Sequence, residues 1–273
     1  MSDRSYPELD VLLAQIGEVG RHLAQINASE GAAGNISVCV RGPLEFRRRF
    51  PDREDIPLPV SVPGLAGATF LVTGSGRRLR ELLDDPEGNL GCLVVDAGGQ
   101  TGRLYSSPQR QFTRLTSEFN SHLAVHNDRM LNSEAQLHTI VHAQPPHLTY
   151  LSHISPYQNE GYLNRRLFRW QPETILQMPE GLGVVPFLVP GSAVLAAATC
   201  EVMRRHQLAI WMKHGAIARS DESVKHAADL VEYAEAAARY EYLNLAAGEP
   251  AQGLSPDEIR SICRAANMQQ SIF

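Results

Sequence analysis

The sequence predicts a single α/β domain over residues 1–273, built on a central mixed, largely antiparallel sheet flanked by helices. Three observations lead to this prediction. Helical and extended segments interleave along the chain, their order lacks the regular βαβα rhythm of a parallel sheet, and no repeat or low-complexity linker separates them. A chain of 273 residues is also long enough to bury a large core.

One long helix and three short strands are expected in the first part of the chain. Apolar residues between Leu9 and Ile26 recur at steps of three and four, which is typical of an amphipathic helix, and the glycines of SEGAAGN end it. ISVCV, which begins at Ile36, alternates as a strand, TFLV leads into the turn TGSG, and LGCLVVD has the composition of a strand buried on both faces. The polar, proline-rich stretch after ISVCV is expected to be a loop.

The middle of the chain alternates between helices and strands. TSEFNSHLAVHNDRML predicts a helix that Thr116 or Ser117 caps at its start. HTIVHAQ predicts a strand, HLTYLSHI a helical turn, and LGVVPFLV another strand. Ser192 then caps an alanine-rich helix.

The last third is expected to contain one strand and two helices. LAIWMKHGAIARS predicts a strand that passes through His214 and Gly215, and Ser220 starts a long helix that ends near Gly248. SPDEIRSICRAA carries a complete start signal, because its serine is a cap, its proline occupies the first helical position, and Glu258 completes a capping box.

Composition argues against nucleic-acid and membrane partners. The formal net charge is −5, and the acidic neighbours of Arg47–Arg49 are typical of a solvated loop. No apolar run is long enough to cross a bilayer, and MSDRSYPELD lacks the apolar core of a signal peptide. The four cysteines form no C-x-x-C pair and indicate free thiols in a reducing compartment, so the protein is expected in the cytoplasm.

Two glycine-rich turns beside strands are candidate anion sites. EGAAGNIS contains Gly34 and Asn35, and TGSGRRLR contains Ser75 and Gly76. Backbone amides in such turns can form a nest for an anion, and Asn35 and Ser75 are placed to donate hydrogen bonds. Ordinary tight turns also contain glycine, and neither segment matches a P-loop or a dinucleotide fingerprint.

Three residues of the TSEFNSHLAVH segment are candidates for chemistry, each with a structural alternative. Glu118 either acts in catalysis or is a first-turn acid that the helix dipole favours. His122 and His126 lie one helical turn apart, so they form either a ligand pair or a surface or half-buried stripe.

Later in the chain, IVHAQ places two candidate ligands at a strand end. His142 and Gln144 are two residues apart, so alternation along the strand points them to the same side. His214, just before a glycine, is either a further ligand or a core histidine with a satisfied ring.

The ordered set of these motifs is more specific than any one of them. AAGN, TGSG, TSE, HAQP and HG occur in this order and together resemble the class II aldolase/adducin family. The resemblance runs from the first helix to the last. FLVTGSGRRLRELLDDPEGNLGCLVVD, LTSEFNSHLAVH and GVVPFLVPGS are similar to the corresponding segments of members that cleave L-rhamnulose 1-phosphate.

The resemblance implies a metal-dependent active site. Family members hold one divalent metal per subunit, usually zinc, with histidines that His142 and His214 match. The metal acts as a Lewis acid and stabilises the enediolate formed when a carbon–carbon bond breaks. Glu118 matches the catalytic acid/base, and Glu173, in QPETILQMPEG, aligns with a second proton-handling acid.

The resemblance also implies how a small phosphorylated sugar is held. Asn35, Ser75 and Ser117 match phosphate-loop positions, with Gly34 and Gly76 giving access to the backbone. The implied assembly is a homotetramer with the site at a subunit boundary.

Two departures from the family pattern bear on this site. Gln144 stands where a second histidine ligand is expected, and Ala32 and Ala33 replace polar residues near the phosphate turn. An amide oxygen is a harder, neutral ligand that binds zinc less tightly than imidazole and tolerates manganese or magnesium better. A modified but functional metal site is predicted.

The leading functional hypothesis is an aldehyde-lyase that cleaves L-rhamnulose 1-phosphate into dihydroxyacetone phosphate and L-lactaldehyde. Another reaction of the same superfamily is the first alternative: cleavage of fuculose phosphate, 4-epimerisation, dehydration or decarboxylation. The second is a non-catalytic, adducin-like assembly protein. Metal content and product analysis distinguish these hypotheses.

Overall fold

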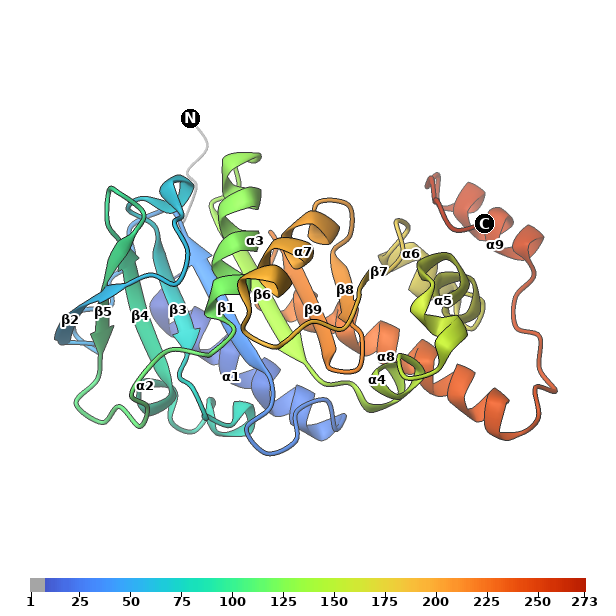
Figure 1. Cartoon of the computed structure of the whole chain (residues 1–273), viewed down its shortest axis with the longest axis horizontal. Coiled ribbons are helices and arrows are strands. Elements are labelled where there is room, and N and C mark those ends of the chain that lie inside the picture. Colours follow the sequence, from blue (N-terminus) through green and yellow to red (C-terminus); the bar gives the residue numbers. More distant parts are fainter. Residues whose placement is uncertain (1–7) are drawn as a thin grey trace.

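One sheet runs through the part of the chain that the computed structural model describes, residues 8–273 (Figure 1). Its nine strands lie in the order β2-β5-β4-β3-β1-β6-β9-β8-β7. Neighbouring strands are antiparallel except β7 and β8, which are parallel, so the predicted mixed, largely antiparallel sheet is confirmed. The strands are β1 Asn35–Val40, β2 Asp52–Pro57, β3 Thr69–Thr73, β4 Leu90–Val95, β5 Thr101–Ser106, β6 Leu137–Ala143, β7 Gly183–Val185, β8 Leu208–Trp211 and β9 Gly215–Ser220.

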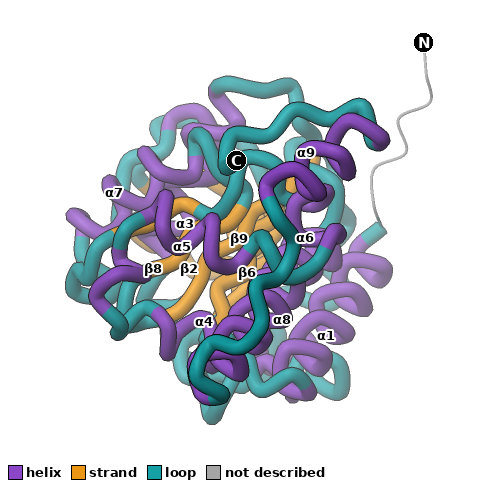
Figure 2. Tube along the Cα trace, turned by 90° about the vertical axis from the view of Figure 1, so that its right-hand side faces the viewer, coloured by secondary structure: helices purple, strands orange, loops and turns teal. Residues whose placement is uncertain are grey.

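Helices cover both faces of the sheet. α1 and α8 pack together on one face, and α3 and α7 pack together on the other (Figure 1). Figure 2 looks from the β7 end, where α5, α6 and α9 gather. The helices are α1 Leu9–Gln25, α2 Pro86–Asn89, α3 Phe119–Leu131, α4 Pro146–Leu151, α5 Glu160–Leu167, α6 Pro172–Gln177, α7 Ala193–Met203, α8 Val224–Ala246 and α9 Pro256–Ala265. Across residues 8–273, none of the helices combines the length and the apolar character that spanning a membrane requires.

Local sequence signals account for several of these elements. The apolar face of α1 is buried against the sheet, with Ile16 and Leu23 fully inaccessible. The Ser192 side chain accepts a hydrogen bond from the Leu195 amide and caps α7, as predicted. The predicted capping box of α9 is present as well.

The expectation of a loop after β1 is wrong in part. DREDIP forms β2, an exposed strand at the edge of the sheet, and TGRLYS forms its partner β5. Charged residues have low strand propensity, but an edge strand is held through its backbone and tolerates charge on both faces. No alternation of apolar residues marks β2, so the sequence pattern could not reveal it.

LAIWMKHGAIARS forms a hairpin rather than the single strand that was expected. β8 ends at Trp211, β9 begins at Gly215, and these two residues face each other across the hairpin. Lys213 occupies the turn with a φ of 63°, a left-handed conformation that an extended strand does not contain. The turn places His214 at the end of the sheet rather than within it.

The predicted start of α3 is also corrected. Glu118 occupies the N-cap position and makes no side-chain cap hydrogen bond, so neither Thr116 nor Ser117 is the cap. The Thr116 hydroxyl instead accepts a hydrogen bond from the Glu118 amide at 3.4 Å. The Glu118 carboxylate is therefore free to bond with side chains of other elements.

Two further boundaries differ from the prediction. Ser223, not Ser220, caps α8, because the strand β9 continues through Ser220. Of the segment LGVVPFLV, only Gly183–Val185 pairs as a strand.

Candidate metal centre and active site

Three elements meet at one end of the sheet and bring the predicted ligands together. His142 lies near the end of β6, where it faces Asn35 of β1 on one side and Ile217 of β9 on the other. His214 ends the hairpin turn that leads into β9, and Glu118 lies at the start of α3. Residues far apart in sequence thus converge through strand pairing.

Glu118, His142 and His214 form a compact cluster of metal-ligand type. One ligand atom from each residue lies within 4.8 Å of the other two. His142 Nε2 is 3.4 Å from Glu118 Oε2, and His214 Nε2 is 3.3 Å from Glu118 Oε1. Glu118 and His142 are buried and His214 is half-buried. Two imidazoles and a carboxylate are a donor set that suits zinc and related divalent ions.

The orientation of the His142 ring is set by a backbone carbonyl. Its Nδ1 lies 2.9 Å from the Ala216 carbonyl oxygen, so Nδ1 carries the proton and donates it to that oxygen. Nε2 is then the ring nitrogen that faces Glu118. This arrangement, in which a carbonyl fixes the tautomer of a ligand, is usual around protein-bound metals.

Trp211 supports both rings, although the sequence analysis did not identify it. Its indole stacks on His214 with centroids 5.1 Å apart and contacts the His142 ring at 4.7 Å. The indole N–H donates to Thr199 of α7 at 2.8 Å, which fixes the ring plane. Only the hairpin geometry, which sequence alone did not reveal, places Trp211 beside both histidines.

The cluster has the protonation states that a cation needs. Burial raises the pKa of Glu118, but His142, the Asn35 hydrogen bond and His214 outweigh it and hold the pKa below its ordinary value. Burial, followed by His142, lowers the pKa of His214 despite the nearby Glu118. An ionised carboxylate and a neutral imidazole are the forms that bind metal.

Gln144 borders the same space as His142, as alternation along the strand predicts. A Cβ built on Gly215 would lie 3.0 Å from Cε1 of His142 and 3.1 Å from Cγ of Gln144. The backbone N–H of Gln144 donates to the Ala28 carbonyl oxygen at 2.8 Å, which anchors the chain at this position. Its role as a ligand stays a prediction.

The TGSG turn lies alongside the chain that leads into Glu118. Gly74 pairs with Leu115 in an isolated bridge, and the Ser75 amide donates to the Arg114 carbonyl at 2.9 Å. Ser75 is half-buried, whereas Gly76 is exposed and has a φ of 74°. Backbone hydrogen bonds thus hold the turn against residues 114 and 115.

The AAGN turn reaches the carboxylate directly. Asn35 Nδ2 donates to Glu118 Oε2 at 2.9 Å, while its buried Oδ1 has no partner in the described chain. Gly34 has a φ of 84°, and a Cβ there would lie 3.0 Å from the His142 carbonyl oxygen. Ser117 is exposed next to Glu118. The AAGN turn therefore contacts the Glu118–His142–His214 cluster, whereas the TGSG turn contacts the segment that leads into Glu118.

Glu173 is not part of the Glu118–His142–His214 cluster. It is exposed on α6, a helix that packs against α8 and α9. His147 turns away from the cluster as well, because its Nδ1 pairs with Glu235 at 2.5 Å.

The prediction of a surface or half-buried histidine stripe on α3 is wrong. His122 and His126 are both fully buried. The Ser37 hydroxyl lies 2.7 Å from His122 Nδ1 and 2.7 Å from His126 Nε2, and His126 Nδ1 lies 2.7 Å from Nδ1 of His138. These residues form a hydrogen-bonded chain inside the core, in which His122 Nε2 and His138 Nε2 have no partner within the described residues. A single-helix pattern cannot show such a chain.

Comparison with known proteins identifies the family. The model of the class II aldolase and adducin N-terminal domain matches residues 14–242. The chain belongs to this family. It is 27% identical to a rhamnulose-1-phosphate aldolase of Bacteroides thetaiotaomicron over 266 residues, which cover 96% of each chain. It is 28% identical to that of Klebsiella pneumoniae over 78% of this chain and 76% of the relative. Together with the family match, these relatives indicate that the chain is an enzyme, an aldehyde-lyase of the class II aldolase type.

Solved structures of class II aldolases share the fold. A sugar-phosphate aldolase from Thermotoga maritima superposes with a TM-score of 0.74 at 28% identity, covering 89% of this chain and 98% of that one. An L-fuculose 1-phosphate aldolase superposes with a TM-score of 0.60 at 17% identity, covering 96% and 98%. The second likeness concerns the fold alone.

Proposed function

We propose that this enzyme cleaves L-rhamnulose 1-phosphate, by a metal-dependent aldol reaction, into dihydroxyacetone phosphate and L-lactaldehyde. The observation that carries the proposal is the convergence of His142 Nε2 and His214 Nε2 on the Glu118 carboxylate. The names of the relatives, which match over most of the chain, support the choice of sugar.

His142 and His214 are the residues that would hold a divalent metal, with Gln144 as a third protein ligand. Zinc is the first choice, because two of the ligands are imidazoles, and the amide makes manganese or magnesium the next candidates. When bound, such an ion supplies Lewis-acid stabilisation of the oxyanion that develops as the carbon–carbon bond breaks.

Glu118 is the proposed acid/base. Its lowered pKa keeps the carboxylate ionised at neutral pH, so it can accept the proton of the substrate hydroxyl at the breaking bond. Asn35 holds one carboxylate oxygen at 2.9 Å and thereby orients it. The proton is taken up as the carbonyl of L-lactaldehyde forms, and the electrons of the broken carbon–carbon bond stay with the dihydroxyacetone phosphate fragment.

The substrate phosphate is proposed to lie between the two glycine-rich turns. Asn35 of the first turn contacts Glu118, Ser75 of the second turn donates to Arg114 in the segment before Glu118, and Ser117 is exposed. These contacts support the proposal. Backbone amides in left-handed glycine turns suit a phosphate anion.

Glu173 is proposed as the second proton-handling residue. Because it is exposed on α6, this role requires a site shared between subunits. The homotetramer that we propose would provide such a site. We further propose a cytoplasmic location, since the four cysteines are free thiols.

The test is retro-aldol turnover of L-rhamnulose 1-phosphate by metal-replete enzyme, with dihydroxyacetone phosphate measured as product. We expect Glu118→Gln to lower kcat by roughly 10²-fold or more, the range typical of a lost acid/base. Glu134→Gln, which changes an exposed carboxylate, is the matched control. Metal content of each sample separates the loss of a ligand from the loss of a base.

Fuculose 1-phosphate and ribulose 1-phosphate are tested in parallel. Faster release of dihydroxyacetone phosphate from one of these would change the proposed substrate, and an epimer or dehydrated product would change the reaction. Near-normal turnover by Glu118→Gln would remove this residue from the mechanism.

A further inference from the structure

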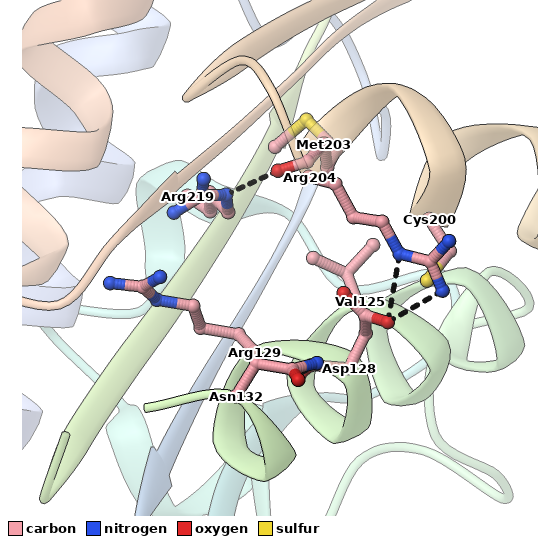
Figure 3. A pocket seen from close by; sticks show the side chains of 8 residues that line it. All are labelled: Val125, Asp128, Arg129, Asn132, Cys200, Met203, Arg204 and Arg219. Atoms are coloured by element: carbon pink, nitrogen blue, oxygen red, sulfur yellow. Dashed lines mark hydrogen bonds and ion pairs between the residues drawn. The ribbon is translucent and has the colours of Figure 1, made fainter. Parts of the chain in front are cut away.

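A second polar cavity lies on the α3 and α7 face, away from the metal cluster (Figure 3). It measures about 420 Å³ and is lined by three arginines, Arg129 of α3, Arg204 after α7 and Arg219 of β9. Arg219 lies four residues along β9 from Gly215, which corresponds to ~13 Å at the rise of a strand. The cavity is therefore separate from the proposed active site.

Two of the three arginines already have carboxylate partners. Arg129 pairs with Asp221, its Nε lying 2.9 Å from Oδ2. Arg204 donates from Nε and Nη2 to Asp128 Oδ1 at 3.0 and 2.8 Å (Figure 3). Their charges are largely balanced within the chain.

Arg219 differs from its two neighbours. Its Nε donates to the Met203 carbonyl oxygen at 2.8 Å (Figure 3), and within residues 8–273 it forms no ion pair. The side chain is half-buried, so water compensates only part of its charge. This leaves Arg219 without a carboxylate partner in the described chain, because Asp128, which also lines the cavity, is bonded to Arg204.

Charges of both signs surround Arg219. Burial, followed by the charge of Arg129, lowers the pKa of Arg219. The carboxylates of Asp221, Glu180 and Asp128 act in the opposite direction but do not outweigh these two causes. Burial, followed by Arg219 and Arg129, lowers the pKa of His138 well below its ordinary range. His138 Nε2 is also buried without a partner in the described chain. Arg219 is thus a partly desolvated guanidinium beside a second one, and the carboxylates of Asp221 and Asp128 are already bonded to Arg129 and Arg204.

We propose that this cavity is a binding site for a small phosphate dianion, free or as the phosphate of a small ester, held chiefly by Arg219 with Arg129 and Arg204 beside it. The planar, forked donors of arginine match phosphate oxygens in pairs. A volume of about 420 Å³ accommodates phosphate with a short carbon chain, since ligand sites commonly measure ~300–1,000 Å³. This site is independent of the proposed aldol reaction.

Cys200 provides a local reporter of occupancy. It lines the same cavity and is half-buried, whereas the other three cysteines are fully buried. Bound phosphate shields its thiol and places negative charge beside it, so alkylation by iodoacetamide should slow. The probe is inorganic phosphate, added at constant ionic strength, and labelling of the Cys200 peptide is followed by mass spectrometry. Phosphate bound in the proposed active site should not change the alkylation rate of Cys200.

We expect saturable protection of Cys200 in the unmodified enzyme, with a rate roughly tenfold lower once phosphate reaches ten times its Kd. Arg219→Gln should abolish the protection. Arg204→Gln, a change at an exposed side chain, should weaken it. Arg205→Gln removes an equal charge from an exposed neighbour outside the cavity and should leave protection unchanged. Absence of saturable protection in the unmodified enzyme would overturn the proposal. Protection in Arg219→Gln that equals the protection in Arg204→Gln would overturn it too.

Discussion

At the scale of single residues, Glu118 shows how one side chain can serve several elements. Because it occupies an N-cap position without capping its own helix, its carboxylate accepts from Asn35 of β1 and faces His142 of β6 and His214 of the hairpin turn. Burial raises the pKa of Glu118, but these contacts lower it by more, so the pKa lies below its ordinary value. A local pattern marks the residue only as a first-turn acid, whereas its chemistry comes from partners far along the chain.

Gln144 allows the composition of the metal site to be tested by a single change. Because its side chain borders the same space as the His142 ring, Gln144→His would place an imidazole where an amide now lies. Imidazole is the better donor to zinc, so we expect the Kd for zinc to fall by roughly tenfold, which corresponds to ~1.4 kcal/mol. Competition with a chromogenic chelator measures the Kd.

Gln177→His is the matched control, since Gln177 is exposed on α6. Equal zinc affinity in the unmodified protein and Gln144→His would mean that position 144 does not face the ion.

At the scale of elements, what the sequence could predict depended on how local the signal was. Helix α1, the Ser192 cap and the capping box of α9 follow from residues within a turn of each other, and these predictions were confirmed. Strand β2 has no such signal, since its pairing with β5 alone makes it a strand. The Trp211 contact with both histidines likewise depends on the hairpin turn.

The same argument applies to the candidate site. The candidate ligands His142 and His214 were predicted through the resemblance of ordered motifs, and the structure brings them together with Glu118. Glu173 was predicted in the same way, but nothing in its local sequence shows whether α6 approaches this cluster. That placement depends on tertiary and quaternary packing.

The β6–β9 pairing yields a prediction about close backbone approach. A Cβ at Gly215 would lie 2.5 Å from the Ala143 carbonyl oxygen and 3.0 Å from Cε1 of His142, so Gly215→Ala must push the two strands apart. We expect a loss of about 1–3 kcal/mol in the free energy of unfolding, the usual cost of overpacking, together with weaker zinc binding. Urea denaturation and zinc titration measure the two effects.

Gly98→Ala serves as the control, because a Cβ at Gly98 would meet nothing within 4 Å. If Gly215→Ala matched Gly98→Ala in both measurements, the close approach of β6 and β9 would not constrain the site.

At the scale of the whole molecule, the core that joins the sheet to α3 contains titratable groups. His126 of α3 and His138 of β6 are fully buried and bonded to each other through their Nδ1 atoms. Burial, the largest cause for both, lowers their pKa values well below the ordinary range; the second cause for His126 is His138, and for His138 it is Arg219. Both rings are therefore neutral in the folded protein at pH 7.

This burial predicts how global stability responds to acid. The unfolded chain binds protons at these histidines below pH ~6.5, whereas the folded chain does not until its much lower pKa values are reached. The free energy of unfolding should therefore fall as pH decreases from 6.5, by about 1.4 kcal/mol per pH unit for each buried histidine. His138→Asn keeps a polar group beside His126 but removes one titrating ring, so the slope between pH 6.5 and 5 should become shallower by about one proton. His153→Gln, at an exposed position, should leave the slope unchanged. Urea denaturation across this pH range measures the slopes, and equal slopes for His138→Asn and the unmodified protein would show that His138 takes up no proton on unfolding.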